Sequence, residues 1–130
     1  MSANKCMAIV ASVFALAIAG CVTAPVYNVT RAPVTSSKAN VTLDDVSKAI
    51  VRAGTQLGWQ MKETKPGHIL ATLYLRTHVA VVDVNYSTTS YSITYKSSTD
   101  LNYDGTNIHK NYNGWIQNLD KGIRTQLSLL

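Results

Sequence analysis

Hydrophobic and polar residues alternate along the chain with two different periods, and each period predicts a type of element. Over residues 43–57, apolar residues recur at steps of three and four, opposite polar ones, which is the spacing of one face of an α-helix. Thr42 precedes this stretch, Asp44 and Asp45 lie in its first turn, and Gly58 follows it, as is typical of the two ends of a helix. An amphipathic helix is therefore expected over about 43–57.

From Trp59 onward the period changes to two, which is typical of strands with one buried face. Four strands are expected, near residues 59–64, 68–76, 78–86 and 90–96. The segments between them are short, and Lys65-Pro66-Gly67 has the Pro-Gly order of a tight turn. Consecutive strands are therefore expected to pair as antiparallel neighbours.

Side-chain parity tests whether these strands form one sheet, because residues that pair across a turn must face the same way. A three-residue loop is expected at 65–67. Four-residue loops are expected around 76–77 and 88–89, because Arg-Thr and Thr-Thr are poor two-residue turn pairs. The resulting pairs include Met61 with Ala71, Leu73 with Ala80, and Val84 with Ile93. All three registers place the same residues on one face: Trp59, Met61, Ile69, Ala71, Leu73, Leu75, Ala80, Val82, Val84, Tyr86, Tyr91, Ile93 and Tyr95.

The C-terminal stretch returns to helical spacing, with apolar residues at steps of three and four from Ile108 to Leu127. Both predicted helices need an apolar surface to cover, and the sheet offers one such face. The expected fold is therefore a two-layer α+β domain of order αββββα. It consists of a four-stranded antiparallel meander with two helices on one face.

The first twenty residues follow neither pattern. A short polar start that contains Lys5 precedes an uncharged run from Met7 to Ala19. At about 1.5 Å per residue this run spans ~20 Å, which is less than the ~30 Å hydrocarbon core of a bilayer. The run therefore favours the hydrophobic region of a secretory signal peptide over a membrane-spanning anchor.

This run ends in Ile18-Ala19-Gly20-Cys21, which resembles the lipobox of bacterial lipoprotein precursors. The resemblance implies that residues 1–20 are a signal peptide that is removed and that the Cys21 thiol carries diacylglycerol, with fatty acids such as palmitate. Because Val22 rather than Asp follows the cysteine, the resemblance favours the outer membrane, with the domain in the periplasm or exposed on the cell surface. The chain as a whole has the general look of small uncharacterised proteobacterial lipoproteins.

Residues 21–41 are expected to form the lipid anchor and a flexible tether, because they contain Pro25 and Pro33 and few large apolar residues. An edge strand over residues 26–30 is the alternative. The globular α+β domain is then expected at 42–130, which is within the usual size of one domain.

The composition narrows the classes of partner and chemistry. The chain has 130 residues, of which 15% are charged, with 12 Lys and Arg against 7 Asp and Glu. A nucleic-acid partner is not expected, because the basic residues are scattered rather than clustered. Cys6 lies in the removed segment and Cys21 is used for lipid, so no thiol remains for a disulfide, a zinc site or a nucleophile.

Residues that could carry catalysis do not gather in the sequence. His68 and His78 lie at opposite ends of a predicted strand, about 25–30 Å apart at ~3.3 Å per residue, too far to share a metal ion. The carboxylates show no spacing typical of a general acid and base, and no nucleophile elbow is present. A non-enzymatic protein without a cofactor is therefore expected.

One motif resembles the first half of a calcium loop, with Asp100, Asn102 and Asp104 at alternate positions and Gly105 at the sixth. The twelfth position is Asn111, where such a loop needs a bidentate Glu. The motif therefore favours an ordinary Asp/Asn/Gly turn, and calcium is a weak alternative.

A second motif combines aromatic and amide side chains, which are typical of glycan-binding surfaces. Its members are Tyr103, Tyr112, Trp115, Asn107, Asn111, Asn113 and Asn118. Aromatic residues at helical spacing also occur in helix cores. Residues 100–118 are therefore an alternative ligand-binding region, for calcium or for a glycan such as peptidoglycan.

Parity also defines the face of the sheet that neither helix covers. Its centre contains Leu70, Thr72, Tyr74, Val79 and Val81, and its flanks contain Lys62, His68, Asp83 and Lys96. An apolar patch with a polar rim is typical of a protein contact, although a solvated face or a cover from residues 26–30 would also fit. The main hypothesis is a lipid-anchored envelope protein of unknown task that docks on an envelope protein through this patch.

Overall fold

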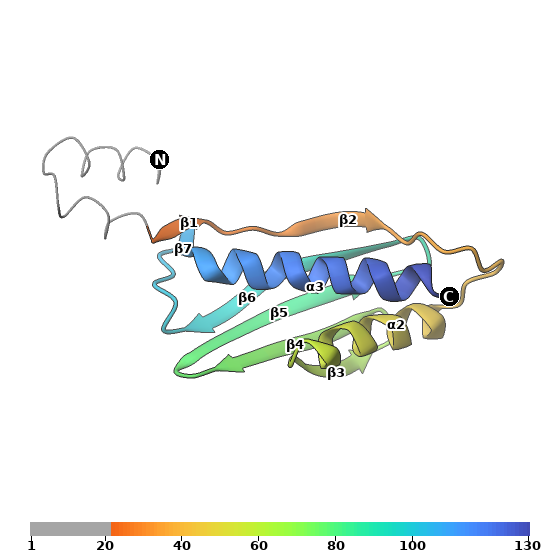
Figure 1. The fold of residues 1–130 in the computed structure, drawn as a ribbon, viewed down its shortest axis with the longest axis horizontal. Coiled ribbons are helices and arrows are strands. Elements are labelled where there is room, and N and C mark those ends of the chain that lie inside the picture. The colour runs from red at the N-terminus through yellow and green to blue at the C-terminus, as the bar shows by residue number, and fades with distance from the viewer. Residues whose placement is uncertain (1–21) are drawn as a thin grey trace, which may run out of the picture.

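The structure is a computed structural model and describes residues 22–130. Residues 1–21, which include the lipobox-like segment and Cys21, lie outside the described residues. The elements are β1 (Thr23–Pro25), β2 (Val29–Pro33), α2 (Leu43–Gln56), β3 (Gln60–Lys65), β4 (His68–Leu75), β5 (His78–Tyr86), β6 (Ser90–Thr99), β7 (Asn107–His109) and α3 (Lys110–Ser128). Figure 1 shows both helices in front of one face of the main sheet.

The predicted α+β class is confirmed, but the predicted four-stranded sheet is too small. Strands β3 to β6 pair in chain order, as expected of a meander, and β2 adds a fifth strand beside β6. The order across the antiparallel sheet is β2-β6-β5-β4-β3. A separate two-stranded sheet joins β1 to β7.

The registers derived from parity are those of the structure. Met61 pairs with Ala71, Leu73 with Ala80, and Val84 with Ile93. The centre of the face beneath the helices is closed to solvent. The side chains there are fully or almost fully buried: Ile69, Ala71, Ala80, Val82, Val84, Tyr91 and Ile93. Alternation within each strand was therefore sufficient to identify the core face.

The turns differ from the expectation at two of three positions. Leu75 pairs with His78, so Arg76 and Thr77 form a two-residue turn in which Arg76 has a φ of 56°. A positive φ at the first turn residue is what a tight hairpin needs. Pro66-Gly67 is likewise a two-residue turn, with a register shift before Lys65. The loop between Tyr86 and Tyr91 has the four residues expected.

Strands β1 and β2 correct the prediction of a flexible tether over residues 21–41. Val29 pairs with Ile93 and Ala32 with Tyr91, and both are buried. The register shift between them, where Arg31 has a φ of 48°, turns both side chains to the core although they are three residues apart. The edge-strand alternative was therefore the better one, although the strand starts three residues later than residue 26.

Helix α2 begins at a reciprocal cap. The Thr42 side chain accepts a hydrogen bond from Asp45 N at 3.1 Å, and Asp45 Oδ2 accepts one from Thr42 N at 3.0 Å. The hydrogen bond from Lys38, followed by those from Thr42, lowers the pKa of Asp45 to about 2. Farther along, Gly54 is buried against the Met61 side chain, which occupies the space that a Cβ would need.

Helix α3 is attached to the sheet by apolar side chains and by one polar cluster. Tyr112, Ile116, Leu119, Ile123 and Leu127 are buried along one side of it. Asp120 accepts a hydrogen bond from the Tyr91 hydroxyl and lies 3.1 Å from Arg124 Nη2. Burial and then the contact with Asp120 raise the pKa of Tyr91, and the hydrogen bond to Asp120 raises the pKa of Arg124.

Candidate functional site

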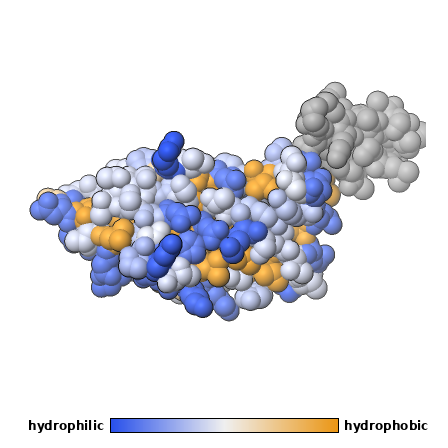
Figure 2. Space-filling view, turned by 180° about the vertical axis from the view of Figure 1, so that it is seen from behind, coloured by the Kyte–Doolittle hydropathy of each residue, from blue (hydrophilic) through white to orange (hydrophobic). Residues whose placement is uncertain are grey.

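The exposed face of the sheet carries the predicted patch at its centre. Thr72 pairs with Val81, Tyr74 with Val79, and Leu70 with Asp83, so the five predicted patch residues are neighbours on β4 and β5. Tyr74 is 60% exposed, and the other four are partly exposed. Both helices lie on the opposite side (Figure 1). Figure 2 shows the molecule from behind, with hydrophobic side chains among hydrophilic ones.

The flanking strands give this patch a polar rim. On β6, the residues that continue these pairs across the sheet carry hydroxyl groups, because Asp83 pairs with Thr94, Val81 with Ser97 and Val79 with Thr99. On β3, Lys62 pairs with Leu70 and Gln60 with Thr72. The apolar residues are therefore confined to the two strands β4 and β5.

One ionic cluster lies at the edge of the patch. His68 Nε2 lies 2.7 Å from Asp83 Oδ1, and Lys96 Nζ lies 4.0 Å from Asp83 Oδ2. His68 pairs with Asn85, whereas His78 pairs with Leu75 at the other end of the same two strands. The two histidines therefore lie apart, as expected, and His68 is held beside a carboxylate.

The calcium-like motif is folded as a turn in which its carboxylates are engaged. Asp100 accepts a hydrogen bond from the Thr77 hydroxyl, and its carboxylate lies 3.5 Å from His78 Nδ1. Asp104 Oδ1 accepts hydrogen bonds from Thr106 N and Asn107 N at 3.0 and 2.7 Å. Within residues 22–130, no three His, Cys, Asp or Glu side chains are grouped so that they could hold a metal ion. Both carboxylates therefore act as hydrogen-bond acceptors within the fold.

The aromatic and amide motif is divided between the core and the surface. Tyr112 is fully buried, and burial raises its pKa above the usual range. Asn107 is also buried, so neither residue lies on a surface where a glycan could bind. Asn113 Oδ1 accepts a hydrogen bond from Tyr27 N, and its Nδ2 donates one to Pro25 O, both at 2.9 Å. Asn113 therefore holds the N-terminal segment against α3, a role without any signal in the sequence.

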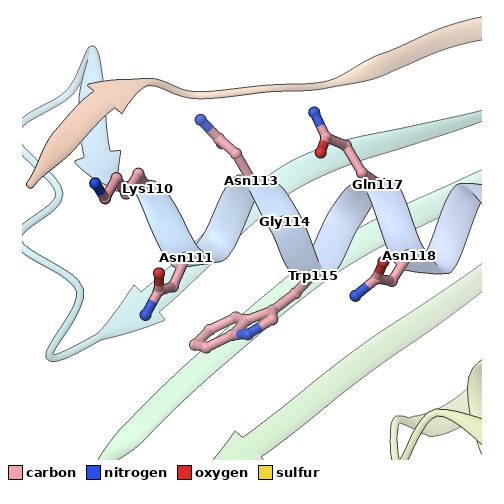
Figure 3. A pocket seen from close by; sticks show the side chains of 7 residues that line it. All are labelled: Lys110, Asn111, Asn113, Gly114, Trp115, Gln117 and Asn118. Atoms are coloured by element: carbon pink, nitrogen blue, oxygen red, sulfur yellow. The ribbon is translucent and has the colours of Figure 1, made fainter.

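Of the remaining residues of that motif, Asn111, Trp115 and Asn118 line an open hollow along the first turns of α3, whereas Tyr103 lies in the loop before β7, against Tyr95. The hollow has a volume of about 500 Å³ and is lined by Lys110, Asn111, Asn113, Gly114, Trp115, Gln117 and Asn118. Figure 3 shows Asn111, Trp115 and Asn118 on one side of the helix and Asn113 and Gln117 on the other, with Gly114 between them. No atom lies within 4 Å of the position of a Cβ on Gly114, so a side chain there would project into free space.

The N-terminal boundary of the described chain lies against the start of α3. Lys110 N donates a hydrogen bond of 2.8 Å to Val22 O, and Thr23 pairs with His109.

Within residues 22–130, no helix is both long and apolar enough to cross a bilayer. Comparison of the chain with protein-family models, with curated proteins and with solved structures finds no match.

Proposed function

We propose that this protein is a lipid-anchored, non-enzymatic protein of the bacterial cell envelope, and that it docks on an envelope protein through the exposed patch on β4 and β5. The supporting observation is the chemistry of the outward positions. An antiparallel sheet with one solvated face usually alternates apolar inward and polar outward residues. Here Leu70, Tyr74, Val79 and Val81 are apolar and point outward.

The rim supports a protein partner of mixed character. Protein interfaces combine an apolar centre with polar and charged groups around it. The hydroxyl groups of β6 can donate and accept hydrogen bonds, and the cluster of His68, Asp83 and Lys96 offers both signs of charge. A partner surface with exposed aliphatic or aromatic side chains and a polar margin fits this arrangement.

Photo-crosslinking in cells tests this proposal. A photoreactive residue at Val81 is expected to give a discrete adduct whose mass identifies the partner, because Val81 lies at the centre of the patch. The control is the same residue at Lys48, which is exposed on α2 on the other side of the molecule. A third position, Thr94, lies on the β6 row of the rim between β5 and β2 and is expected to give a weaker adduct. Equal adducts from Val81 and Lys48, or none from Val81, would contradict the proposal.

The membrane part of the proposal rests on the lipobox-like segment. Replacement of the lipidated residue, Cys21→Ser, is expected to release the protein from the membrane fraction, because a fully acylated cysteine holds a protein far more firmly than a single chain does. The measurement is the distribution of the protein between soluble and membrane fractions after cell breakage. Retention of the variant in the membrane fraction would mean that Cys21 is not the anchor. Placement in the outer membrane is tested by density separation of the two membranes.

The hollow on α3 supports a second candidate function, glycan binding. It presents the Trp115 ring beside the amides of Asn111 and Asn118 (Figure 3), and a ring face with nearby amides can take a sugar by stacking and hydrogen bonds. Soluble peptidoglycan fragments are expected to shift the Trp115 indole NMR signal. The Trp59 indole, which is buried at 4% exposure, is the internal control. A Gly114→Leu variant, which fills the hollow, should lose the shift; a shift that persists would place the glycan elsewhere.

A further inference from the structure

The described chain begins in a segment that is fastened to the domain. Val22 O accepts the hydrogen bond from Lys110 N, and β1 pairs with β7 from Thr23 onward. Val26 N then donates to Thr106 O at 3.0 Å. Together with the two hydrogen bonds of Asn113, these contacts fix residues 22–27 on the start of α3.

This attachment removes the distance between lipid and domain that a tether would provide. Cys21 immediately precedes Val22 in the chain, and consecutive Cα atoms are about 3.8 Å apart. If Cys21 carries lipid, as the proposed function holds, its acyl chains insert into the bilayer only one residue away from Val22, which is hydrogen-bonded to the domain. The part of the domain around Val22 must then lie at the level of the lipid head groups.

Hydrogen bonds identify which segments surround Val22. His109 N, one residue before Lys110, donates to Leu101 O at 2.8 Å. Asp100, in turn, is joined to the β4–β5 turn, because His78 Nδ1 lies 2.6 Å from Asp100 O. The β4–β5 turn, the loop after β6 and the start of α3 therefore form one end of the molecule. We name it the anchor end, and it comprises residues 74–78, 100–106 and 109–110; in Figure 1 the start of α3 lies next to β1, and the loop after β6 and then the β4–β5 turn follow along the same end of the molecule.

The anchor end exposes large apolar side chains. Tyr74 is 60% exposed, Leu75 40% and Tyr103 43%. They make up half of the large hydrophobic residues that are exposed among residues 22–130; the others are Tyr27, Leu57 and Leu129. Tyrosine is favoured at the boundary between head groups and hydrocarbon, because its ring is apolar and its hydroxyl stays in water.

The fixed ring of Tyr103 and two exposed basic residues also fit a lipid surface. The Tyr103 ring stacks on Tyr95 with ring centres 4.2 Å apart, so it is held in place although it is half exposed. Arg76 and Lys110 are exposed and can approach lipid phosphates. Asp100 and Asp104 also lie at this end, but they accept hydrogen bonds from the domain itself, from Thr77 and from Thr106 and Asn107.

We propose that the anchor end is a lipid-contacting surface that seats the domain directly on phospholipid head groups. This inference rests on the proposed lipidation of Cys21. The β3–β4 and β5–β6 turns lie at the other end of the strands and point away from the membrane (Figure 1). Tyr74 then belongs to both surfaces, and the other patch residues, which lie farther along β4 and β5 from the anchor end, stay within reach of a partner in the periplasm.

Lipid-borne quenching of single labels tests this orientation. The lipidated protein is purified from membranes and reconstituted in vesicles of phosphatidylethanolamine and phosphatidylglycerol that contain a head-group spin label. A cysteine for an environment-sensitive fluorophore replaces Thr99, which pairs with Val79 next to the anchor end, or Thr88, in the turn at the far end. The mature chain is expected to hold no other free thiol. The label at position 99 should be quenched severalfold more than the label at position 88.

The outcomes separate this inference from the proposed function. If the protein floats with the vesicles and both labels are quenched equally, the lipid anchor stands and the seated orientation is wrong. If the protein does not float with the vesicles, the lipidation is wrong and the inference fails with it.

Variants of the exposed tyrosines test the surface itself. Tyr74→Ser combined with Tyr103→Ser is expected to reduce the quenching at position 99 to the level at position 88. Tyr74→Ser alone, on the solvated side of β4, gives a partial reduction without disturbing the Tyr103 stack. The matched control is Leu129→Ser, which removes a 71% exposed side chain at the far end and should leave the quenching unchanged. Unchanged quenching in both tyrosine variants would overturn the proposed lipid contact.

Discussion

The two faces of the main sheet are built from alternate residues of the same strands, and they differ in how strictly their chemistry is specified. Ile69 is fully buried beneath the helices, whereas the next residue, Leu70, is only partly buried on the other side. On the helix-covered face the centre is apolar in every strand from β4 to β6. On the exposed face the apolar residues occupy only β4 and β5, between a row of hydroxyl groups and a row with Gln60 and Lys62.

This difference separates the face that stabilises the fold from the face that we propose for recognition. On a covered face the side chains must be apolar or have their polar groups hydrogen-bonded, as in the pair of Tyr91 and Asp120, because an unpaired polar group there is costly. An exposed face has no such requirement, and the confinement of its apolar residues to two strands is the feature on which the proposed contact with a partner rests. The two edge strands are poorer sites for a partner than the exposed face. Strand β2 carries a bulge and Pro33, and β3 carries several charged side chains, and these features hinder pairing with a strand of another chain.

The largest expected effect comes from the neighbouring residues Ile69 and Leu70. Ile69→Ala should lower the free energy of unfolding by about 2–5 kcal/mol, because it leaves a cavity under the helices. Leu70→Ala should cost less than about 1 kcal/mol, because its site is already partly solvated and can be filled by water. Urea unfolding of both variants, followed by circular dichroism, measures the two values. Equal losses would show that the exposed face is covered in the folded protein.

A smaller difference is expected between two aspartates, one on each side of the sheet. Asp120→Ala should cost about 2–3 kcal/mol, because it leaves the buried Tyr91 hydroxyl without its acceptor. Asp83→Ala, on the exposed face, should cost at most about 1 kcal/mol, as is usual for partly exposed ion pairs. The Tyr91→Phe background is the control, since in it the loss of Asp120 should be smaller. A penalty for Asp120→Ala that is the same in both backgrounds would disprove the coupling.

The smallest expected effect is on the free energy of unfolding at low pH, where the N-terminal cap of α2 is lost. The pKa of Asp45 is lowered to about 2, so the folded state favours its charged form. The resulting stabilisation is present above the usual pKa of an aspartate, near 4, and is lost as the pH falls from there through about 2. Unfolding measured from neutral pH to pH 2 should therefore show a steeper loss for the natural chain than for Asp45→Asn. Parallel curves would mean that the cap with Thr42 and Lys38 does not form in solution.

Much of the candidate patch could be predicted from the sequence, whereas the alternative site could not. Parity placed Leu70, Thr72 and Val81 on the exposed face, because alternation is a local property of each strand. The helical spacing of Tyr112 and Trp115 did not show which of them is buried. In the structure Tyr112 packs edge-on against Tyr95 in the core, and Trp115 lines the hollow. Their depth depends on how α3 is rotated on the sheet, and all its contacts set that rotation together.

The sequence by itself determined the two helices, the four central strands, their register and the identity of both sheet faces. Each of these follows from periodicity and short turns, which act between residues close in the chain. Only the tertiary structure decided that β2 joins the sheet and that residues 22–27 lie on α3. Those contacts join residues far apart in the sequence, such as Val29 with Ile93 and Val22 with Lys110, largely through backbone hydrogen bonds. Every residue except proline carries the same backbone N–H and C=O groups, so their pairing does not show in the sequence which distant segment a strand joins, and the edge strand remained only an alternative.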